Sequence, residues 1–496
     1  MNECGRTNRS RRRLGLALAI GMGCAVFSAA LQFSATSMAA PSPSAGTSVV
    51  SVRDAFGPLA CGQPTGTLRA PNSPREPVVA VDPADPNHVV ATYIVDSDLS
   101  NMIRASRDGG LTWQTVPVPG ISACTGGANQ AAADPSLAFS SDGSTLYLAT
   151  LTTPTVAPVG TDTVIVSTSH DGGFTWSPAP TTLSAPDGLF GDRNNVTTDP
   201  THPGTAYITF ERHDSLQYTS STLYFRRTDD AGRTWSAPVA VYSPAADGFS
   251  TGNAQVLRTG NGALVDVFDQ IIACNLNPCL DDKVFEDNIV YAAVSTDEGR
   301  HWAPPVKIGN RTAGPGTHAG AFCGDLWATI QATTSPAGVV YVSFPAAAPT
   351  ASTPLATDLV VAKSADGLSW VTAGTLHAPT VLGLPTLAVA NDGTLGMSYY
   401  QPEATACAAA GTVDATDLWL ARSRNDGRSW TSSMVAGPFD ATGNCFLPRT
   451  PAEGCLIADY DGLQPMGDHG FAAVFEVPHD RGAYESDIRF AHLPSR

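Results

Sequence analysis

An eight-residue motif that recurs six times is the feature that most restricts what this chain can fold into. Each copy has a leading Ser or Thr, a central Asp and Gly, and a closing Trp; the copies are Ser106–Trp113, Ser169–Trp176, Thr228–Trp235, Ser295–Trp302, Ser364–Trp370 and Ser423–Trp430. The fifth copy is one residue short, and the sixth has Asn425 in place of the Asp. The tryptophans are 63, 59, 67, 68 and 60 residues apart. A period of this length indicates one supersecondary unit that is repeated along the chain.

The residue types of the motif favour a tight β-hairpin. An Asp side chain accepts hydrogen bonds from nearby backbone N–H groups, and Gly allows the positive φ that a tight turn needs. The Ser or Thr and the Trp then close the hairpin, and we expect the indole to pack against its own sheet. This motif is the Asp-box, and through its six copies the chain resembles the sialidase (neuraminidase) superfamily over residues 70–495. The box is a hairpin on the rim of propellers of many activities, so it indicates a fold and no reaction.

The repeats predict an all-β propeller of four-stranded antiparallel blades. Short runs rich in β-branched and aromatic residues alternate with Asp, Pro and Gly turns, and no stretch shows a helical period. In the first repeat the expected strands are Val78–Val81, Val89–Ile94, Met102–Ala105 and Trp113–Val118. After the last box, three more are expected at Leu456–Tyr460, Gly470–Val477 and Asp487–His492. A strand from the N-terminal region would complete a seventh blade and leave no open edge. We predict seven blades, with six, the number in sialidases, as the alternative.

The N-terminus predicts export. Arg9 and Arg11–Arg13 precede an apolar run from Leu14 to Phe27, and small residues lead up to Ala39. This is the pattern of a signal peptide, residues 1–39, cleaved after Ala39, so we expect a secreted, extracellular protein. A retained membrane anchor is the alternative, because the run nearly reaches the length of a membrane span. The Pro- and Ser-rich residues 40–60 predict a flexible lead-in. Residues 61–496 are then a single propeller domain without a later membrane span.

The net charge of the chain limits the kinds of partner that we expect. Without residues 1–39 the chain carries 23 basic and 44 acidic residues, a net charge of −21. Such a surface repels phosphate backbones, which argues against nucleic acid as a partner. In a secreted protein this acidity serves solubility, and we expect a monomer.

Eight cysteines follow residue 39, and an even number in an exported protein predicts disulfides. The expected pairs are Cys274 with Cys279, Cys445 with Cys455, Cys61 with Cys124, and Cys323 with Cys407. No CxxC pair and no HExxH motif is present, so we expect no metal and no cofactor. The acidic loop at 280–288 leaves a structural Ca²⁺ open, although its oxygen spacing is not that of a calcium loop.

Polar residues at the start of the repeats predict a site at the centre of the ring. The first strand of each blade lines the central channel, so the starts of these strands meet around one mouth. The residues at these starts are Arg75, Glu76, Asp134, Asp192, Arg193, Asn253, Gln255, Asp325, Asp459, Tyr460 and Asp461; blade six offers only Leu384 and Pro385. Neighbouring carboxyl groups raise one another's pKa, so that one donates a proton while another stays ionised. The alternative is that these residues cap turns and tie blades together.

The resemblance to sialidases implies roles for these residues. That family uses an Asp acid/base, a Tyr nucleophile assisted by Glu, and three arginines around the substrate carboxylate. By this comparison Asp192 or Asp134 is the acid/base, Tyr460 or a neighbouring Asp the nucleophile, and Arg75 and Arg193 belong to the clamp. Glu76 and Asp325 are further catalytic candidates, and Asn253, Gln255 and Asp459 are substrate-binding candidates. For the third clamp arginine, Arg212, Arg258 and Arg449 remain open, and Glu211 and His213 are further candidates for the mouth.

We therefore predict a secreted, sialidase-like glycoside hydrolase that acts on extracellular glycans or polysaccharide. Glycoside hydrolysis needs two carboxyl groups that flank the scissile bond. The alternatives are a non-catalytic propeller that binds carbohydrate or protein, and a polysaccharide lyase with Tyr460 as its base. The sequence contains no GxSxG motif, phosphate-binding loop or dinucleotide fingerprint, which argues against serine hydrolases, NTPases and nicotinamide enzymes.

Overall fold

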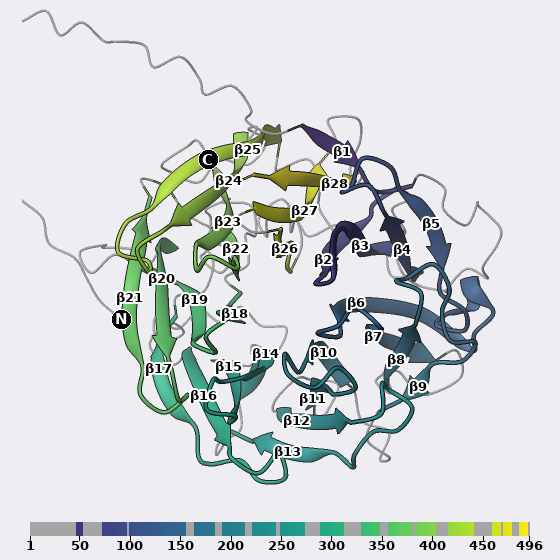
Figure 1. Ribbon diagram of the computed structural model, residues 1–496, viewed down its shortest axis with the longest axis horizontal. Helices are drawn as coiled ribbons and strands as arrows, with labels where there is room; N and C mark the ends of the chain where they lie inside the picture. The colour runs from purple at the N-terminus through teal and green to yellow at the C-terminus, as the bar shows by residue number, and fades with distance from the viewer. Residues whose placement is uncertain are drawn as a thin grey trace, which may run out of the picture. The chain divides into compact units, whose positions relative to one another are not determined.

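Seven four-stranded antiparallel sheets stand around a common axis as the blades of a β-propeller (Figure 1). The computed structural model describes residues 46–52, 72–96, 99–154, 163–183, 191–213, 221–244, 249–272, 288–311, 329–347, 356–378, 380, 383–402, 415–440, 459–467, 470–478 and 486–494. All of them lie in Pro41–Arg496, one of two units into which the chain divides. The predicted seven blades are confirmed, and the six-blade alternative is wrong.

Blades 1 to 6 each consist of four consecutive strands, the first next to the axis and the last at the rim (Figure 1). Blades 1 to 3 comprise β2 (Arg75–Asp82), β3 (Asp85–Val95), β4 (Ser100–Ser106) and β5 (Gln114–Pro117); β6 (Asn129–Phe139), β7 (Leu146–Pro154), β8 (Thr163–Ser169) and β9 (Thr181–Thr182); β10 (Gly191–Thr198), β11 (Ala206–His213), β12 (Ser221–Thr228) and β13 (Val239–Tyr242). Blades 4 to 6 comprise β14 (Phe249–Arg258), β15 (Leu264–Ile272), β16 (Ile289–Ser295) and β17 (Val306–Asn310); β18 (Gln331–Thr334), β19 (Val340–Ala347), β20 (Ala356–Ser364) and β21 (Val371–His377); β22 (Gly383–Val389), β23 (Leu395–Pro402), β24 (Ala415–Ser423) and β25 (Thr431–Asp440).

Blade 7 is built from both ends of the propeller. Its order is β26 (Gly462–Met466), β27 (Gly470–Pro478), β28 (Ser486–Leu493) and β1 (Thr47–Val49). Strand β1 pairs antiparallel with β28, which confirms that an N-terminal strand closes the ring. Because β1 lies inside residues 40–60, the prediction that this whole stretch is a flexible lead-in is wrong. Of the expected strand Leu456–Tyr460 only residues 459 and 460 are described; they are not in a strand, and the innermost strand of this blade begins at Gly462.

Apolar side chains pack mainly between blades. The described residues contain seven buried apolar clusters, and each joins two adjacent blades. In one of them Val90 and Ile103 of blade 1 pack with Leu146 and Leu148 of blade 2. Fully burying such a side chain contributes about 1.5–3 kcal/mol to folding. The ring is therefore stabilised by contacts between repeats that no single repeat makes alone.

Each Asp-box connects the third and fourth strands of its blade. In the first box Asp108 accepts hydrogen bonds from the backbone N–H of Thr112 at 2.8 Å and from its hydroxyl at 2.6 Å. The indole of Trp113 packs against a cluster formed by its own blade and blade 7, and its ring lies 5.3 Å from that of Phe490 in blade 7. Its N–H also donates to Ser48 of β1, at 3.4 Å. The box therefore also fastens its blade to the preceding one.

Several predictions concern residues outside the described part of the chain. These are the signal peptide 1–39, the acidic loop at 280–288 apart from Asn288, Asp325, Arg449 and every cysteine except Cys124, which is disulfide-bonded. Within the described residues no helix is long and apolar enough to span a membrane. The only helical segment among them is the short 3₁₀ turn η1 (Ala123–Thr125). Export, the disulfide pairs and the monomeric state stay predictions.

Candidate functional site

A β-bulge recurs at one end of the innermost strands. In β2, β6, β10, β14 and β22 the pairing register shifts at the same place, around a residue with positive φ. These residues are Glu76 (φ 53°), Asp134 (45°), Arg193 (45°), Asn253 (52°) and Leu384 (47°). A non-glycine residue in this conformation costs about 1–3 kcal/mol, and bulges re-aim side chains next to functional sites. Four of the five are predicted site residues, so the backbone is strained where the polar side chains meet.

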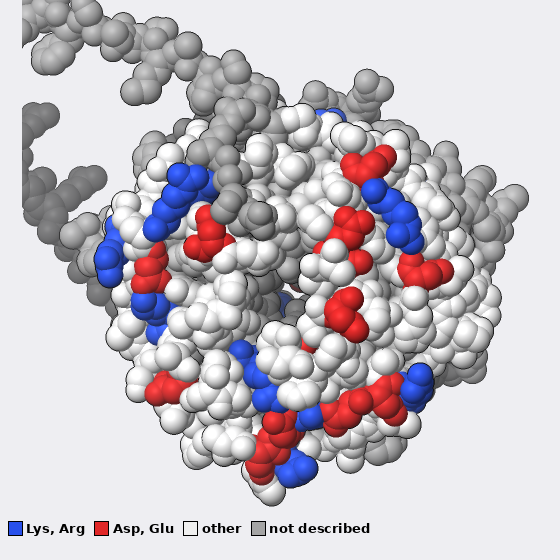
Figure 2. Space-filling model, viewed as in Figure 1, with Lys and Arg blue, Asp and Glu red and all other residues white. Residues whose placement is uncertain are grey.

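A cavity of ≈ 730 Å³ runs along the propeller axis from these bulges. At the bulge end, called the mouth below, its lining includes Asp134, Arg193, Asn253, Asp459 and Tyr460. The other end is lined by residues that include Asp82, Ser141, Thr198 and Asn391. Figure 2 shows that the ring is hollowed at its centre and that acidic side chains lie beside this hollow. Residues from all seven blades that are far apart in the sequence are therefore brought to one axial cavity.

Tyr460 lies just before β26, at the mouth. Its hydroxyl donates to the carbonyl oxygen of Pro135 at 3.4 Å, and the carboxyl group of Glu76 of blade 1 lies near enough to act on its pKa. Burial, followed by the negative charges of Glu76, Asp134 and Asp459, raises the pKa of Tyr460 well above its usual value. The phenol is therefore protonated at neutral pH. The sequence analysis placed Glu76 and Tyr460 at the same mouth without pairing them, and the structure brings the two together.

Arg193 faces four carboxyl groups, which belong to Asp192, Glu211, Asp269 and Asp459. The side chains of Arg193, Glu211 and Asp269 converge over Gly252. A Cβ atom built there would lie 2.7 Å from Asp269 Oδ1, 3.2 Å from Arg193 Nη1 and 3.6 Å from Glu211 Oε1. Although burial opposes it, these carboxyl groups raise the pKa of Arg193, which stays charged.

The surroundings of Asp192 keep it ionised. Its Oδ1 accepts the backbone N–H of Arg193 at 2.9 Å, and its Oδ2 lies 3.6 Å from Nε2 of His213. Burial alone would raise the pKa of Asp192, but His213 and Arg193 outweigh burial and lower it. A proton donor needs the opposite shift. Of the two predicted acid/base candidates, the geometry therefore favours Asp134, which lines the cavity beside Tyr460.

The pKa of Glu211 shifts in the opposite direction. The side chain is buried, and burial raises its pKa well above the usual value. Arg193 opposes this shift, while Asp192, Asp269 and Asp134 add to it. Glu211 therefore holds its proton more tightly than an exposed glutamate does. His213 lies 3.6 Å from Glu211 and is also buried, so both candidates from the end of β11 belong to the cluster around Arg193.

Sequence reasoning missed Asp269 and Arg311. Nε of Arg311 lies 2.6 Å from Asp269 Oδ2, and Asn253 Nδ2 lies 3.2 Å from the same oxygen. A signal was present in the repeats. Asp269 pairs opposite Gly252 as Glu211 pairs opposite Asp192, and the corresponding residues of other blades are Ile94, Leu151 and Tyr400. Aligning the repeats with one another would have shown acidic residues at a position that is apolar or aromatic elsewhere.

No family model and no curated protein matches this chain. Among solved structures it is similar to the Hadza microbial sialidase, at 16% identity and a TM-score of 0.45 over 82% of this chain and 74% of that one. An ulvan lyase is similar at 11% identity and a TM-score of 0.48, over 86% and 96%. The GH93 α-L-arabinofuranosidase of Fusarium graminearum, solved with arabinobiose, is similar at 16% and 0.42, over 71% and 92%. These are likenesses of fold alone.

The chain is an Asp-box β-propeller. Two further residues that the sequence predicted for the mouth, Gln255 and Arg75, have other surroundings in this propeller. Gln255 is a tie between blades 4 and 5: its Nε2 donates to Gln331 at 2.9 Å, and its Oε1 accepts the N–H of Ala332 at 2.6 Å. Arg75 is buried in β2 and is not among the residues that line the cavity.

Arg258, one candidate for a third clamp arginine, lies at the other end of β14. There its Nε pairs with Asp199 Oδ2 at 2.6 Å, and its Nη2 pairs with Glu298 at 2.8 Å. The prediction that Arg258 reaches the mouth of the propeller is therefore wrong. Arg311 is the second arginine at the cluster around Arg193.

Proposed function

We propose that this protein is a secreted glycoside hydrolase with sialidase-like chemistry, which acts on extracellular glycans or polysaccharide at the mouth of the propeller. The observation that supports it most directly is the proximity of the Glu76 carboxyl group to Tyr460. A carboxylate beside a hydroxyl can take its proton as the oxygen attacks, which turns a weak nucleophile into an effective one. Asp134 lies beside this pair and lines the same cavity as Tyr460.

The reaction then has two steps. In the first, the oxygen of Tyr460 bonds to the anomeric carbon, Glu76 takes the phenolic proton, and the glycosidic C–O bond breaks as Asp134 protonates the leaving oxygen. In the second, Asp134 takes a proton from a water molecule that attacks the same carbon. The Tyr460–sugar bond breaks, Tyr460 recovers its proton from Glu76, and the anomeric configuration is retained.

The charges around Tyr460 favour hydrolysis over the lyase alternative. The transition state of glycoside hydrolysis carries positive charge on the sugar ring, and the carboxylates of Glu76 and Asp459 place negative charge beside it. A lyase would need an ionised Tyr460 as base and would build negative charge on the substrate. The raised pKa of Tyr460 opposes the first, and these carboxylates oppose the second.

A panel of fluorogenic glycosides tests the proposal. We expect wild type to cleave at least one of them, and Tyr460→Phe, Glu76→Gln and Asp134→Asn each to lose about 10²–10⁴-fold in kcat/KM. The matched control is Tyr399→Phe, whose hydroxyl donates to Ser432 at 3.0 Å and which does not line the cavity. It should keep wild-type activity. If wild type turns over no glycoside but binds glycans, the propeller is a carbohydrate-binding protein instead.

A further inference from the structure

The two arginines of the Arg193 cluster are already paired with the protein's own carboxyl groups. Arg193 faces Asp192, Glu211, Asp269 and Asp459, and Arg311 lies 2.6 Å from Asp269. Holding a substrate carboxylate takes guanidinium N–H groups that point at the ligand in a fork. Removing an internal partner from a buried ion pair is strongly unfavourable. These two arginines are therefore poorly placed to accept an acidic sugar.

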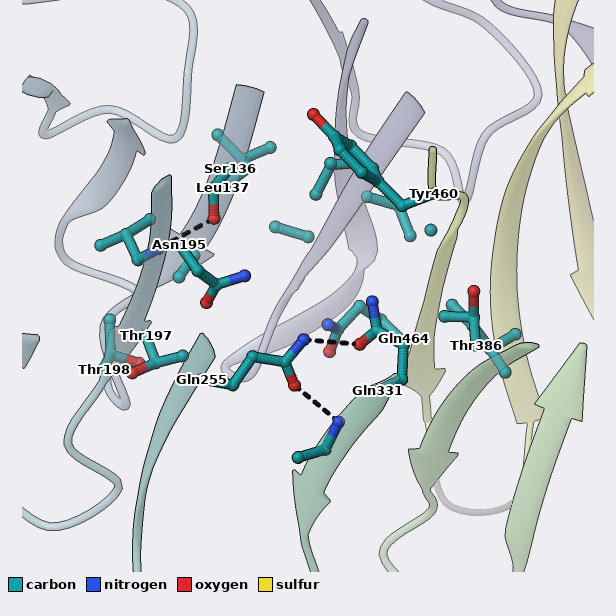
Figure 3. A pocket seen from close by; sticks show the side chains of 18 of the residues that line it. Ser136, Leu137, Asn195, Thr197, Thr198, Gln255, Gln331, Thr386, Tyr460 and Gln464 are labelled. Carbon is teal, nitrogen blue, oxygen red and sulfur yellow. Dashed lines mark hydrogen bonds between the residues drawn. The ribbon is translucent and has the colours of Figure 1, made fainter. Parts of the chain in front are cut away.

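The cavity beyond the mouth is neutral and polar. Four of the side-chain amides in its lining are named the amide collar; they are those of Asn195, Gln255, Gln331 and Gln464 (Figure 3). Gln255 and Gln331 are hydrogen-bonded to each other, whereas the side chain of Gln464 is exposed in the cavity. The hydroxyl groups of Thr197 and Thr386 lie in the same part of the lining.

Charged side chains stand at the two ends of this cavity. Among the described residues of its lining they are Asp134, Arg193, Asp459 and Asp461 at the mouth and Asp82 at the other end. An amide both donates and accepts hydrogen bonds, as a sugar hydroxyl does, so the collar matches a ligand rich in hydroxyl groups. A carboxylate on that ligand would find no cation in the described middle of the cavity and would meet the acidic groups at the mouth.

We propose that this site takes an uncharged, hydroxyl-rich sugar and rejects sugars that carry a carboxylate, such as sialic or uronic acids. Gln464 is the specificity residue that reads the sugar's hydroxyl groups. The proposal rests on the proposed hydrolase function only for its catalytic readout, because binding tests it independently.

The binding test uses one pair of ligands that differ in charge and in one methyl group per sugar residue. Oligogalacturonate and its fully methyl-esterified form are titrated calorimetrically into the Tyr460→Phe variant, which prevents turnover. We expect the neutral ester to bind at least tenfold more tightly than the acid. Gln464→Leu should weaken binding of the ester about tenfold. The control Gln401→Leu removes an amide that bonds Thr380 outside the cavity and should leave binding unchanged.

The catalytic test compares wild-type turnover of neutral 4-methylumbelliferyl glycosides with that of the N-acetylneuraminide and the glucuronide. We expect at least a 100-fold preference for a neutral substrate. Turnover of an acidic glycoside within tenfold of the best neutral one would overturn this inference and leave the hydrolase proposal standing. Preferential binding of the ester without turnover of any glycoside would support this inference and overturn the hydrolase proposal. Equal binding of ester and acid, or binding of neither, would also overturn it.

Discussion

Glu211 on β11 and Asp269 on β15 occupy the same position in successive blades, and both carboxyl groups face Arg193. The repeated scaffold thus carries an acidic pair on one side of its axis. Because Ile94, Leu151 and Tyr400 occupy this position in blades 1, 2 and 6, the pair is not a requirement of the fold. It distinguishes the side of the ring formed by blades 3 and 4, and the first two predictions concern it.

Gly252→Ala should destabilise the protein by about 1–3 kcal/mol and lower turnover at least tenfold. The added Cβ would lie 2.7 Å from Asp269 Oδ1, and Arg311 and Asn253 hold that carboxylate in place. Urea unfolding and kcat/KM measure the two effects. Gly46→Ala is the control, because a Cβ there would have no atom within 4 Å. Wild-type stability of the Gly252→Ala variant would contradict this account of the cluster.

Glu211→Gln should become more stable relative to wild type as the pH rises. The pKa of Glu211 is raised in the folded state, so the folded protein binds this proton more tightly than the unfolded chain. Wild type therefore keeps its full stability below the unfolded pKa of about 4.3 and loses stability as the pH rises toward the folded pKa. Gln does not titrate. Unfolding free energies at several values between pH 4 and 8 give the difference, and a difference independent of pH would argue against a raised pKa of Glu211.

Asp199→Ala should cost about 3–5 kcal/mol of stability. Its side chain is fully buried and accepts hydrogen bonds from Arg258 at 2.6 Å and from Tyr207 at 2.5 Å, which joins blades 3 and 4. Asp229→Ala is the matched control, because its side chain is 62% exposed in its pair with Arg227 and should cost less than about 1 kcal/mol. Chemical denaturation measures both. Equal losses for the two variants would rule out this difference between buried and exposed pairs.

Lowering the pH should weaken the hydrogen bonds that Asp108 accepts in the first Asp-box. Replacing Asp108 with Asn should remove that effect. Hydrogen bonds from the hydroxyl and N–H of Thr112 and from the hydroxyl of Ser106 lower the pKa of Asp108 to about 2. A lowered pKa stabilises the fold above the usual pKa of about 3.9, and this contribution is lost as the pH falls to the folded value. Asp108→Asn should therefore lose less of its melting temperature than wild type between pH 5 and 2.

The sixth box supplies the reciprocal variant. Its Asn425 already accepts the N–H of Ser429 at 2.9 Å, so the hairpin forms without a charge there. Asn425→Asp should make the melting temperature fall more steeply with acid. If both variants follow the wild-type pH profile, the box carboxylates do not contribute to acid sensitivity.

The sequence by itself determined the blades, because the interactions that form them are local. Ser106, Asp108 and Thr112 complete their hydrogen bonds within eight residues, and the six copies predict the propeller. The same repeat also located Glu76, Asp134, Arg193 and Asn253, since equivalent positions in a propeller meet at its axis. In the structure these four residues lie at the β-bulges of the innermost strands.

Only the tertiary structure decided which of these groups act on one another. Tyr460 meets Glu76 because β1 closes blade 7 against blade 1, and Asp269 meets Arg193 across two blades. The partner of Trp113 in blade 7 likewise depends on ring closure. Packing of the blades brings these groups into contact. Burial and the charges of the neighbouring groups then shift their pKa values. No local pattern encodes them, because they exist only once the blades are packed around the axis.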